Sequence, residues 1–330
     1  MLKGVHPVSV PKVSVILAIY NVESYLRESL DSLAAQTLKD IEIIGVNDGS
    51  TDGCLQILKE YAAKYPNFRY VDKPNGGIGS ARNAGVAVAK GEYIGFTDPD
   101  DYVAHNMYEI LYNTAVNDNS EVVVCGGTAF PDDPEPPQWL VDALSPRRMR
   151  YSTFDKALLF TENSRQFTWR MLIKRSLYTD NHVMQNENIV LGEDVGLQFK
   201  IYPLAHGISL IPDKLYYYRW VRPGSIMYCD SEAKLTEKAD KRILLVEHLL
   251  DTLMEYDLFK DTRKDFLQWS AEFIYGDLMK LPRKERLRFS DRLYKLYQKA
   301  DLRTEWAGYR PELRAMFEDF VKPNGKASSE

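Results

Sequence analysis

Apolar runs alternate with amphipathic segments through the first hundred residues. Residues 13–19 are almost all apolar, and a run this short is typical of a buried strand. Leucines at helical spacing follow over residues 26–33, and a second apolar run covers residues 41–46. This order predicts a βαβ unit, in which the two strands lie parallel.

The same alternation continues to about residue 97. A helical pattern covers residues 55–61, a short strand is predicted at 68–71, a helix at 80–89 closed by Gly91, and a strand at 93–97. Repeated alternation of this kind predicts an α/β fold, with a mainly parallel, Rossmann-like sheet flanked by helices on both faces.

Each of three predicted strands ends in a polar group. These groups are Tyr20-Asn21, residues 47–50 and residues 98–101. Ligands of parallel sheets bind beyond the carboxyl ends of the strands. We therefore expect the three groups to line one crevice.

The pattern changes twice later in the chain. Residues 131–137 are too rich in proline for a helix or strand interior and indicate a surface loop. From about residue 231 apolar positions recur at helical spacing. The sequence thus predicts an α/β domain over residues 1–228 and a helical extension over 229–330.

Composition narrows the class of protein. Of the 330 residues 45% are hydrophobic and 27% charged, as in soluble globular proteins, and a net charge of -5 argues against nucleic acid as a partner. Cys54, Cys125 and Cys229 form no CxxC pair, which favours a reducing cytosol. The apolar run at 13–20 is too short to span a bilayer and lacks a cleavage site. A cytoplasmic protein is expected.

Three carboxylates crowd the end of the strand at 93–97. Asp98, Asp100 and Asp101 repel one another unless a cation or hydrogen-bond donors compensate. Mg²⁺ or Mn²⁺ held by one or two of them, with a diphosphate in the remaining positions, would act as a Lewis acid. The alternative is a solvated turn or a helix cap. The position after a buried strand favours the metal.

Asp48 lies in a segment with glycines that permit a tight backbone. Its carboxylate can accept a hydrogen bond from a ligand NH, such as that of uracil. The alternative is an Asx-turn, with Ser50 or Asp52 capping the next helix.

Residues 75–83 form a glycine-rich loop that opens a helix and can bring backbone NH groups and Arg82 near phosphate. Arg82 stands where the dinucleotide fingerprint needs its third glycine, and the chain has no Walker A motif. Both absences weaken the NAD-enzyme and ATPase hypotheses.

Taken together, residues 19–23, 47–53, Ala81-Arg82-Asn83 with Gly85, and the DxD motif of 98–101 resemble the family 2 glycosyltransferases, inverting enzymes of GT-A fold. The resemblance is strong over about residues 13–125 and looser to about 228, and it implies a nucleotide-binding half at about 13–125 and an acceptor half at about 126–228. It implies contacts to a nucleotide-sugar donor, expected to be a UDP-sugar, from Ile19, Tyr20, Glu23, Asp48, Arg82, Asn83 and Asp98. It also implies a divalent metal at Asp100 and Asp98.

An inverting transferase needs a base that deprotonates the acceptor hydroxyl, and a positioned carboxylate supplies roughly 10²- to 10⁴-fold. Leu191-Gly192-Glu193-Asp194-Val195 is similar to the family's Glu-Asp element. On that match Asp194 is the base and Glu193 its neighbour. The alternative is that the pair caps a helix beginning near Val195.

Residues 218–225 resemble the family's segment that closes over the pyrophosphate, with Arg219 or Arg222 as the cation. They are also similar to the Gln-x-x-Arg-Trp element of processive synthases, but Tyr216 occupies the Gln position and no transmembrane helices are present. Addition of a single sugar is therefore expected. Trp169 matches a family tryptophan that either stacks on an acceptor sugar or packs beneath the site.

Residues 280–299 carry eight basic and two acidic side chains, a net charge of about +6, beside an apolar stripe. They predict either an ordinary packed helix or a surface helix that contacts anionic lipid. The second alternative fits a family whose members often extend lipid-linked glycans at the inner membrane surface.

The sequence thus predicts an inverting glycosyltransferase of bacterial surface polysaccharide synthesis, with a glycan or lipid-linked acceptor. It would be cytoplasmic, with a peripheral contact to the cytoplasmic face of the inner membrane if 280–299 bind lipid. Two other hypotheses are a non-catalytic nucleotide-binding or scaffold protein of the same fold and a sugar nucleotidyltransferase. The latter lacks a basic, glycine-rich N-terminal signature here.

Overall fold

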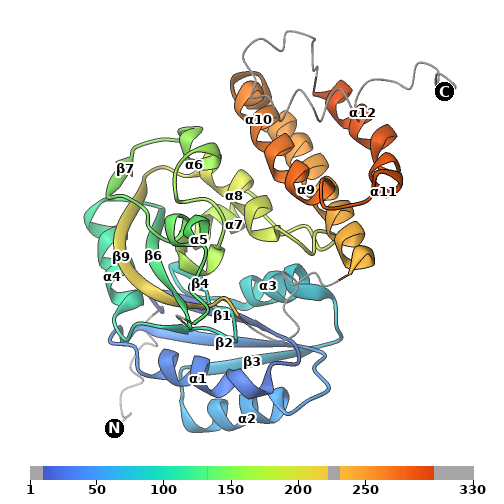
Figure 1. Ribbon diagram of the computed structural model, residues 1–330. Coiled ribbons are helices and arrows are strands. Elements are labelled where there is room, and N and C mark those ends of the chain that lie inside the picture. The colour runs from blue at the N-terminus through green and yellow to red at the C-terminus, as the bar shows by residue number, and fades with distance from the viewer. Residues whose placement is uncertain (1–9, 132, 222–230, 301–330) are drawn as a thin grey trace, which may run out of the picture. The chain divides into compact units, whose positions relative to one another are not determined.

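The computed structural model describes residues 10–131, 133–221 and 231–300 (Figure 1). The described residues form two compact units. The first takes the chain up to Val190 and resumes at Lys200, and the second takes Leu191–Phe199 and the helices that follow residue 223. The expected boundary at 228 lies outside the described residues, and residues 191–199 are grouped with the helices of the second unit.

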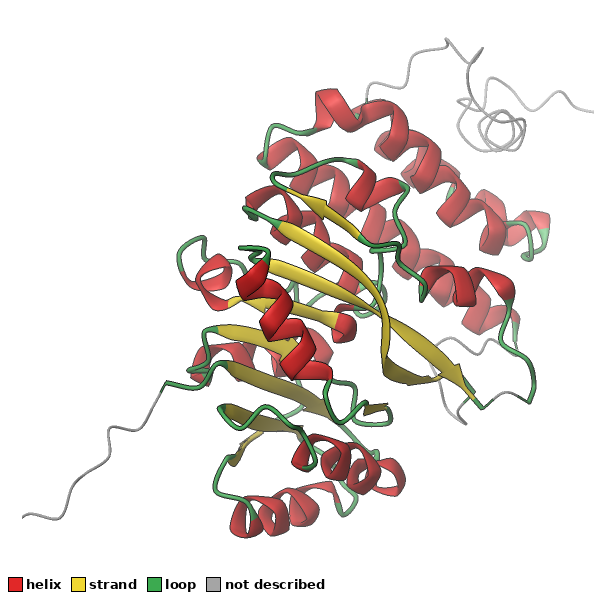
Figure 2. Ribbon diagram, turned by 90° about the vertical axis from the view of Figure 1, so that its left-hand side faces the viewer, coloured by secondary structure: helices red, strands yellow, loops and turns green. Residues whose placement is uncertain are grey.

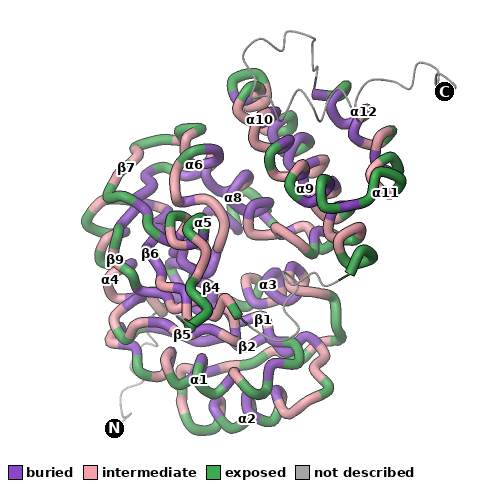
Figure 3. Tube along the Cα trace, viewed as in Figure 1, coloured by how far each residue is buried: buried purple, intermediate pink, exposed green. Residues whose placement is uncertain are grey.

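The amino-terminal half of the first unit is a parallel sheet. Strands β1 (Val13–Ile19), β2 (Ile41–Asp48), β3 (Phe68–Lys73) and β4 (Tyr93–Phe96) lie in the order β3-β2-β1-β4. All three pairings are parallel. Strands β1, β2 and β4 are buried almost throughout (Figure 3), as their apolar sequences predict.

Three helices cover this half. Figure 1 shows α1 (Glu23–Ala34) and α2 (Cys54–Lys64) on one face and α3 (Gly77–Val88) on the other. The leucines predicted on α1 are buried in the same apolar core as Val15 and Leu17. Helix α3 begins three residues before the predicted residue 80, because the Asp48 carboxylate accepts hydrogen bonds from the NH groups of Gly76 and Gly77 and so satisfies the helix start.

The sheet continues with mixed pairing. Strand β8 (Met171–Lys174) runs antiparallel to β4 and to β6 (Val122–Phe130), and β9 (Ile208–Arg219) runs parallel to β6. Short strands β5 (Tyr102–Val103) and β7 (Met149–Tyr151) pair with β9, which completes a nine-stranded sheet among the described residues (Figure 2). The helices of this half are α4 (Met107–Asn117), α5 (Gln138–Ala143), α6 (Ala157–Phe160) and α7 (Arg175–Thr179), with a 3₁₀ turn at Thr168–Arg170. The predicted fold class is confirmed.

The second unit is helical. Helix α8 (Glu193–Leu204) crosses the boundary between the units, and α9 (Glu232–Glu255), α10 (Phe259–Leu278), α11 (Arg283–Leu287) and α12 (Ser290–Lys299) follow. Their core is apolar and includes Ile243, Leu250, Phe266 and Leu293. None of the helices within the described ranges is long and apolar enough to cross a bilayer.

Candidate active site

The three predicted polar groups gather at one edge of the sheet, because β2, β1 and β4 are parallel neighbours whose carboxyl ends share that edge. The backbone NH of Asn21 donates to Ser50 Oγ (3.2 Å), and Thr51 donates its NH to Asn21 Oδ1 (2.8 Å). On the other side, Ser29 Oγ on α1 donates to the Asp98 carbonyl (3.4 Å). The structure therefore links all three segments.

Glu23 sits at the start of α1 and bridges to the start of α2. Its NH donates to Asp52 Oδ2 (3.0 Å), while its Oε2 accepts from the NH of Gly53 (2.7 Å). Ile19 ends β1 and is buried, whereas the Tyr20 side chain is 49% exposed at the same edge. Tyr20 can thus meet a ligand directly, and Glu23 fixes the two helix starts beside it.

The Asp48 carboxylate is buried and well supplied with donors. Oδ1 accepts from Lys73 Nζ (2.6 Å) and the NH of Gly76 (3.0 Å), and Oδ2 accepts from the NH of Gly77 (2.8 Å). Asp48 therefore anchors the glycine-rich loop. Sequence reasoning missed Lys73, since a lysine at the end of a strand carries no distinguishing pattern.

Arg82 and Asn83 are adjacent on α3 but turn to different partners. The buried Arg82 guanidinium donates to Asp98 Oδ1 (3.1 Å) and lies over the Phe96 ring, 5.5 Å from its centroid. Asn83 is bonded instead to Gln185 and Glu187. Arg82 is thus bonded to the turn of residues 98–101 that follows β4, whereas Asn83 is bonded to the segment that precedes α8.

The turn after β4 divides its carboxylates by environment. Asp98 and Asp100 are half-buried, and Asp101 is buried. Burial raises the pKa of Asp101 well above its ordinary value, and the charges of Asp100 and Asp98 raise it further. Asp101 accepts from Tyr216 Oη (2.8 Å) and from the NH of Arg219 (2.7 Å). Asp101 therefore anchors the turn to β9 and leaves the two other carboxylates at its surface.

Arg219 braces the same turn from outside. Its Nε donates to the Asp100 carbonyl (2.9 Å), its Nη2 donates to Glu28 (2.6 Å), and its guanidinium lies over the rings of Tyr25 and Phe130. The guanidinium of Arg219, predicted to bind the pyrophosphate, therefore contacts Asp100 and Glu28 in this structure. Arg222, the other predicted cation, lies outside the described residues.

Asp98 and Asp100 suit a hard divalent cation that is shared with a ligand. Within the described ranges no group of three or more His, Cys, Asp or Glu side chains is arranged to hold a metal ion alone. Two half-buried carboxylates separated by one proline are the donor set from which Mg²⁺ or Mn²⁺ is bound together with substrate phosphates.

The predicted Glu-Asp element opens α8. Glu193 and Asp194 are half-buried in the first helical turn, where the helix dipole favours negative charge. The helix begins at Glu193, two residues before the predicted start. Both residues lie in the stretch 191–199, which is grouped with the second unit, whereas the residues predicted to bind the donor lie in the first. The role of Asp194 as the base therefore stays a prediction.

Trp169 is a packing residue. It is 1% exposed and stacks on Tyr216 with 3.8 Å between ring centroids. Two roles were predicted for Trp169, stacking on an acceptor sugar and packing beneath the site. In the structure it packs on Tyr216, whose hydroxyl is bonded to Asp98 and Asp101.

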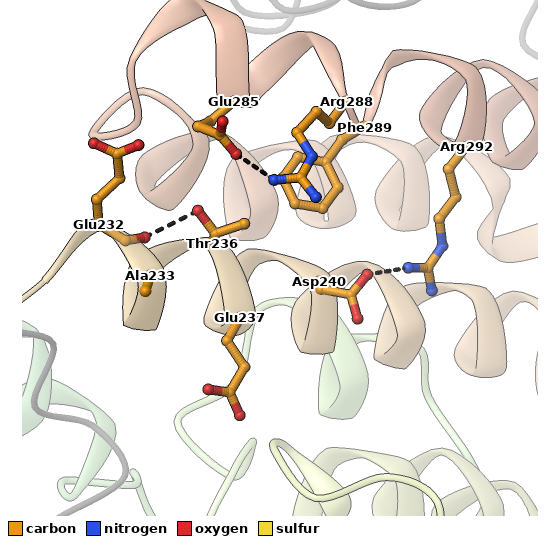
Figure 4. Close-up of a pocket in the computed structure, with 9 residues that line it drawn as sticks. All are labelled: Glu232, Ala233, Thr236, Glu237, Asp240, Glu285, Arg288, Phe289 and Arg292. Atoms are coloured by element: carbon orange, nitrogen blue, oxygen red, sulfur yellow. Dashed lines mark hydrogen bonds and ion pairs between the residues drawn. The ribbon is translucent and has the colours of Figure 1, made fainter.

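A separate hollow of about 870 Å³ lies in the second unit, between α9 and the α11–α12 pair (Figure 4). Its charges largely pair among themselves, Arg288 with Glu285 and Arg292 with Asp240. None of the predicted site residues lines it.

Comparison with known proteins places the chain in a family. Residues 14–180 match the family model described as glycosyl transferase family 2. The uncharacterized glycosyltransferase EpsJ of Bacillus subtilis is 33% identical over 238 residues, which cover 71% of this chain and 68% of EpsJ. The minor teichoic acid biosynthesis protein GgaB, from the same organism, is 32% identical over 74% of this chain, although this is only 27% of GgaB.

Solved structures share the fold. The S. aureus protein TarS, residues 1–349 in complex with UDP, superposes with a TM-score of 0.70 at 22% identity, covering 94% of this chain and 88% of that one. The mannosyltransferase PcManGT from Pyrobaculum calidifontis, in complex with GDP-Man and Mn²⁺, gives 0.55 at 17% identity, with coverages of 95% and 88%.

Proposed function

Because the chain belongs to glycosyl transferase family 2, we propose that it transfers a single sugar with inversion from a UDP-sugar to a glycan or lipid-linked acceptor in surface polysaccharide synthesis. The observation that carries the proposal is the turn after β4. Asp101 is held beneath it by Tyr216 and Arg219, while Asp98 and Asp100 remain at its surface. The UDP-bound TarS neighbour supports the nucleotide, and the similarity to GgaB supports the pathway class.

The donor would bind along the edge formed by β2, β1 and β4. Tyr20 is exposed there for the nucleoside, and Asp48 holds the glycine-rich loop that starts α3. Arg82 donates to Asp98 and so keeps one carboxylate oriented. These residues would bind and orient the donor.

Asp98 and Asp100 would hold Mg²⁺ or Mn²⁺ together with the donor diphosphate. When bound, this cation offsets the negative charge that develops on the leaving nucleotide. The Mn²⁺ complex of PcManGT supports the assignment for the fold.

Asp194 would act as the general base. Its carboxylate takes the proton of the acceptor hydroxyl as that oxygen forms a bond to the anomeric carbon, while the bond from that carbon to the diphosphate breaks. The products are a glycoside of inverted configuration and UDP. Glu193, its neighbour, would face the acceptor.

Two variants test these roles. We expect Asp100→Ala to abolish both transfer and manganese-dependent UDP binding, because it removes a ligand of the cation. Asp194→Asn should lower kcat by about 10²- to 10⁴-fold, since it removes the base, and should leave the UDP Kd nearly unchanged. Calorimetry with UDP and Mn²⁺ and a UDP-release assay over a panel of UDP-sugars measure both effects. Equal loss of binding in the two variants would contradict the roles, and UDP binding without release from any sugar would favour a scaffold.

A further inference from the structure

Asn83 uses its side chain almost fully on a distant segment of the chain. Its Oδ1 accepts from the NH of Gln185 (2.9 Å), and its Nδ2 donates to the Gln185 carbonyl (3.0 Å) and to Glu187 Oε1 (3.2 Å). Asn83 is 7% exposed. A carboxamide offers two NH donors and one acceptor oxygen, and both atoms are engaged here. We call these three hydrogen bonds the Asn83 clasp.

The clasp fixes a segment that has no regular structure of its own. Between the end of α7 at Thr179 and the start of α8 at Glu193 the chain forms neither helix nor strand. The segment also lies in contact with α3, since a Cβ at Gly79, one turn before Asn83, would lie 3.4 Å from the Asn186 carbonyl oxygen. Irregular segments depend on such side-chain bonds for their position.

The same segment supports α8. Lys200 Nζ donates to the carbonyl of Met184 (3.1 Å), the residue next to Gln185. Lys200 and Asp194 lie on one helix, six residues or about 9 Å of helical rise apart. A displacement of the segment would therefore shift the helix that carries Asp194.

We propose that Asn83 is a positioning residue for Asp194: it sets the place of α8 through the clasp and Lys200, rather than binding the donor. The inference rests on the proposed function, because Asp194 is the base only in that function. A displacement of about 1 Å of a reacting group can cost on the order of 10²-fold in rate. Asn83 is thus expected to act on kcat and not on nucleotide affinity.

The test replaces the donor of the clasp and then restores it. Asn83→Asp puts a carboxylate against the Gln185 carbonyl and the Glu187 carboxylate. We expect kcat to fall by roughly 10²-fold, with the donor KM and the UDP Kd within about twofold of wild type. Glu187→Gln, the matched control, keeps an acceptor oxygen and should be near wild type. The double variant lets the new amide at position 187 donate to the new carboxylate at 83, and should recover at least about tenfold of the lost kcat.

Two results would overturn the proposal. One is a UDP Kd raised about tenfold in Asn83→Asp with kcat unchanged, which would make Asn83 a donor contact. The other is wild-type kinetics in Asn83→Asp. If Asn83→Asp does not fold, Glu187→Ala removes one bond from an exposed residue, and a several-fold loss of kcat is expected; no loss would count against the clasp.

Failure of the proposed function can be told apart from failure of the clasp. If the wild-type protein shows no transfer, amide hydrogen exchange over residues 183–190 still reports on the clasp. Faster exchange in Asn83→Asp than in Glu187→Gln would uphold the clasp without the catalytic role. Equal exchange would reject both.

Discussion

Tyr216 is bonded through its hydroxyl to the turn after β4, which carries the two carboxylates proposed to bind the metal. Its Oη accepts from the NH of Asp98 (3.0 Å) and donates to Asp101 Oδ2 (2.8 Å). We expect Tyr216→Phe to lower the free energy of unfolding by about 1–3 kcal/mol, because the buried Asp101 oxygen loses its donor. UDP binding with Mn²⁺ should weaken as well, since Asp98 loses its anchor. Denaturant unfolding and calorimetry measure the two effects.

Tyr217→Phe is the matched control for this prediction. The Tyr217 ring stacks on Tyr102 with 4.5 Å between centroids, and no hydrogen bond of its hydroxyl is found among the described residues. We expect nearly unchanged stability and binding. If the two variants behave alike, the hydroxyl of Tyr216 does not hold the turn.

Individual residues were predictable where their role is local. The carboxylates at the strand ends follow from the pattern of apolar runs, and the structure gathers them at one edge of the sheet. Partners of Asp48, Asp101 and Asn83 were not predictable, because Lys73, Tyr216 and Gln185 lie 25, 115 and 102 residues away and carry no local signal.

At the scale of elements, the close approach of α3 to β1 depends on a glycine. A Cβ at Gly85 would lie 2.4 Å from Ile16 Cγ2. We expect Gly85→Ala to lower the free energy of unfolding by about 1–3 kcal/mol, because the buried strand cannot move away from the helix. Denaturant unfolding of the full chain measures it.

Gly276 offers the opposite case on α10. Nothing in the described part of the chain lies within 4 Å of a Cβ built there, and the residue is exposed. We expect Gly276→Ala to raise the free energy of unfolding by about 0.5–1 kcal/mol through helix propensity. Destabilisation by both alanines, or by neither, would show that helix packing at Gly85 is not the cause.

The elements of the first hundred residues follow from sequence more fully than the later ones. Strands β1, β2 and β4 are short apolar runs between turn residues, and each of the four strands β1 to β4 was predicted within two residues at either end. Strands β6, β8 and β9 were not placed. They pair across insertions of many residues, and β9 contains the polar residues Asp213 and Lys214, so its pattern does not alternate regularly.

At the scale of the whole molecule, the residues predicted for the site are divided between the two units. The residues assigned to the donor and the metal belong to the first unit, except for Arg222 outside the described ranges, and Glu193 and Asp194 belong to the second. Helix α8 contributes residues to both units, since Glu193–Phe199 are grouped with the second unit and Lys200–Leu204 with the first. A sequence pattern predicts the helix but not the unit to which its residues belong, because that assignment depends on contacts between residues far apart in the chain.

The basic segment 280–299 is less available to a membrane than its composition indicates. The apolar stripe at Phe289, Leu293, Leu296 and Tyr297 is buried in the helical unit. Four of the basic side chains are ion-paired: Lys280 with Asp277, Arg288 with Glu285, Arg292 with Glu247, and Lys299 with Asp251. Insertion of the stripe into a bilayer would require the unit to unpack.

Any binding to anionic membranes should therefore be electrostatic and weak. Arg283, Lys284 and Lys295 are exposed, and a basic side chain near an anionic surface contributes on the order of 1 kcal/mol, which salt screens. We expect flotation with phosphatidylglycerol vesicles at low salt only, and its loss near physiological ionic strength or in Arg283→Glu/Lys284→Glu. Neutral vesicles serve as the control. Flotation that persists at high salt would mean that the stripe leaves its core to enter lipid, because hydrophobic insertion, unlike attraction between charges, is not screened.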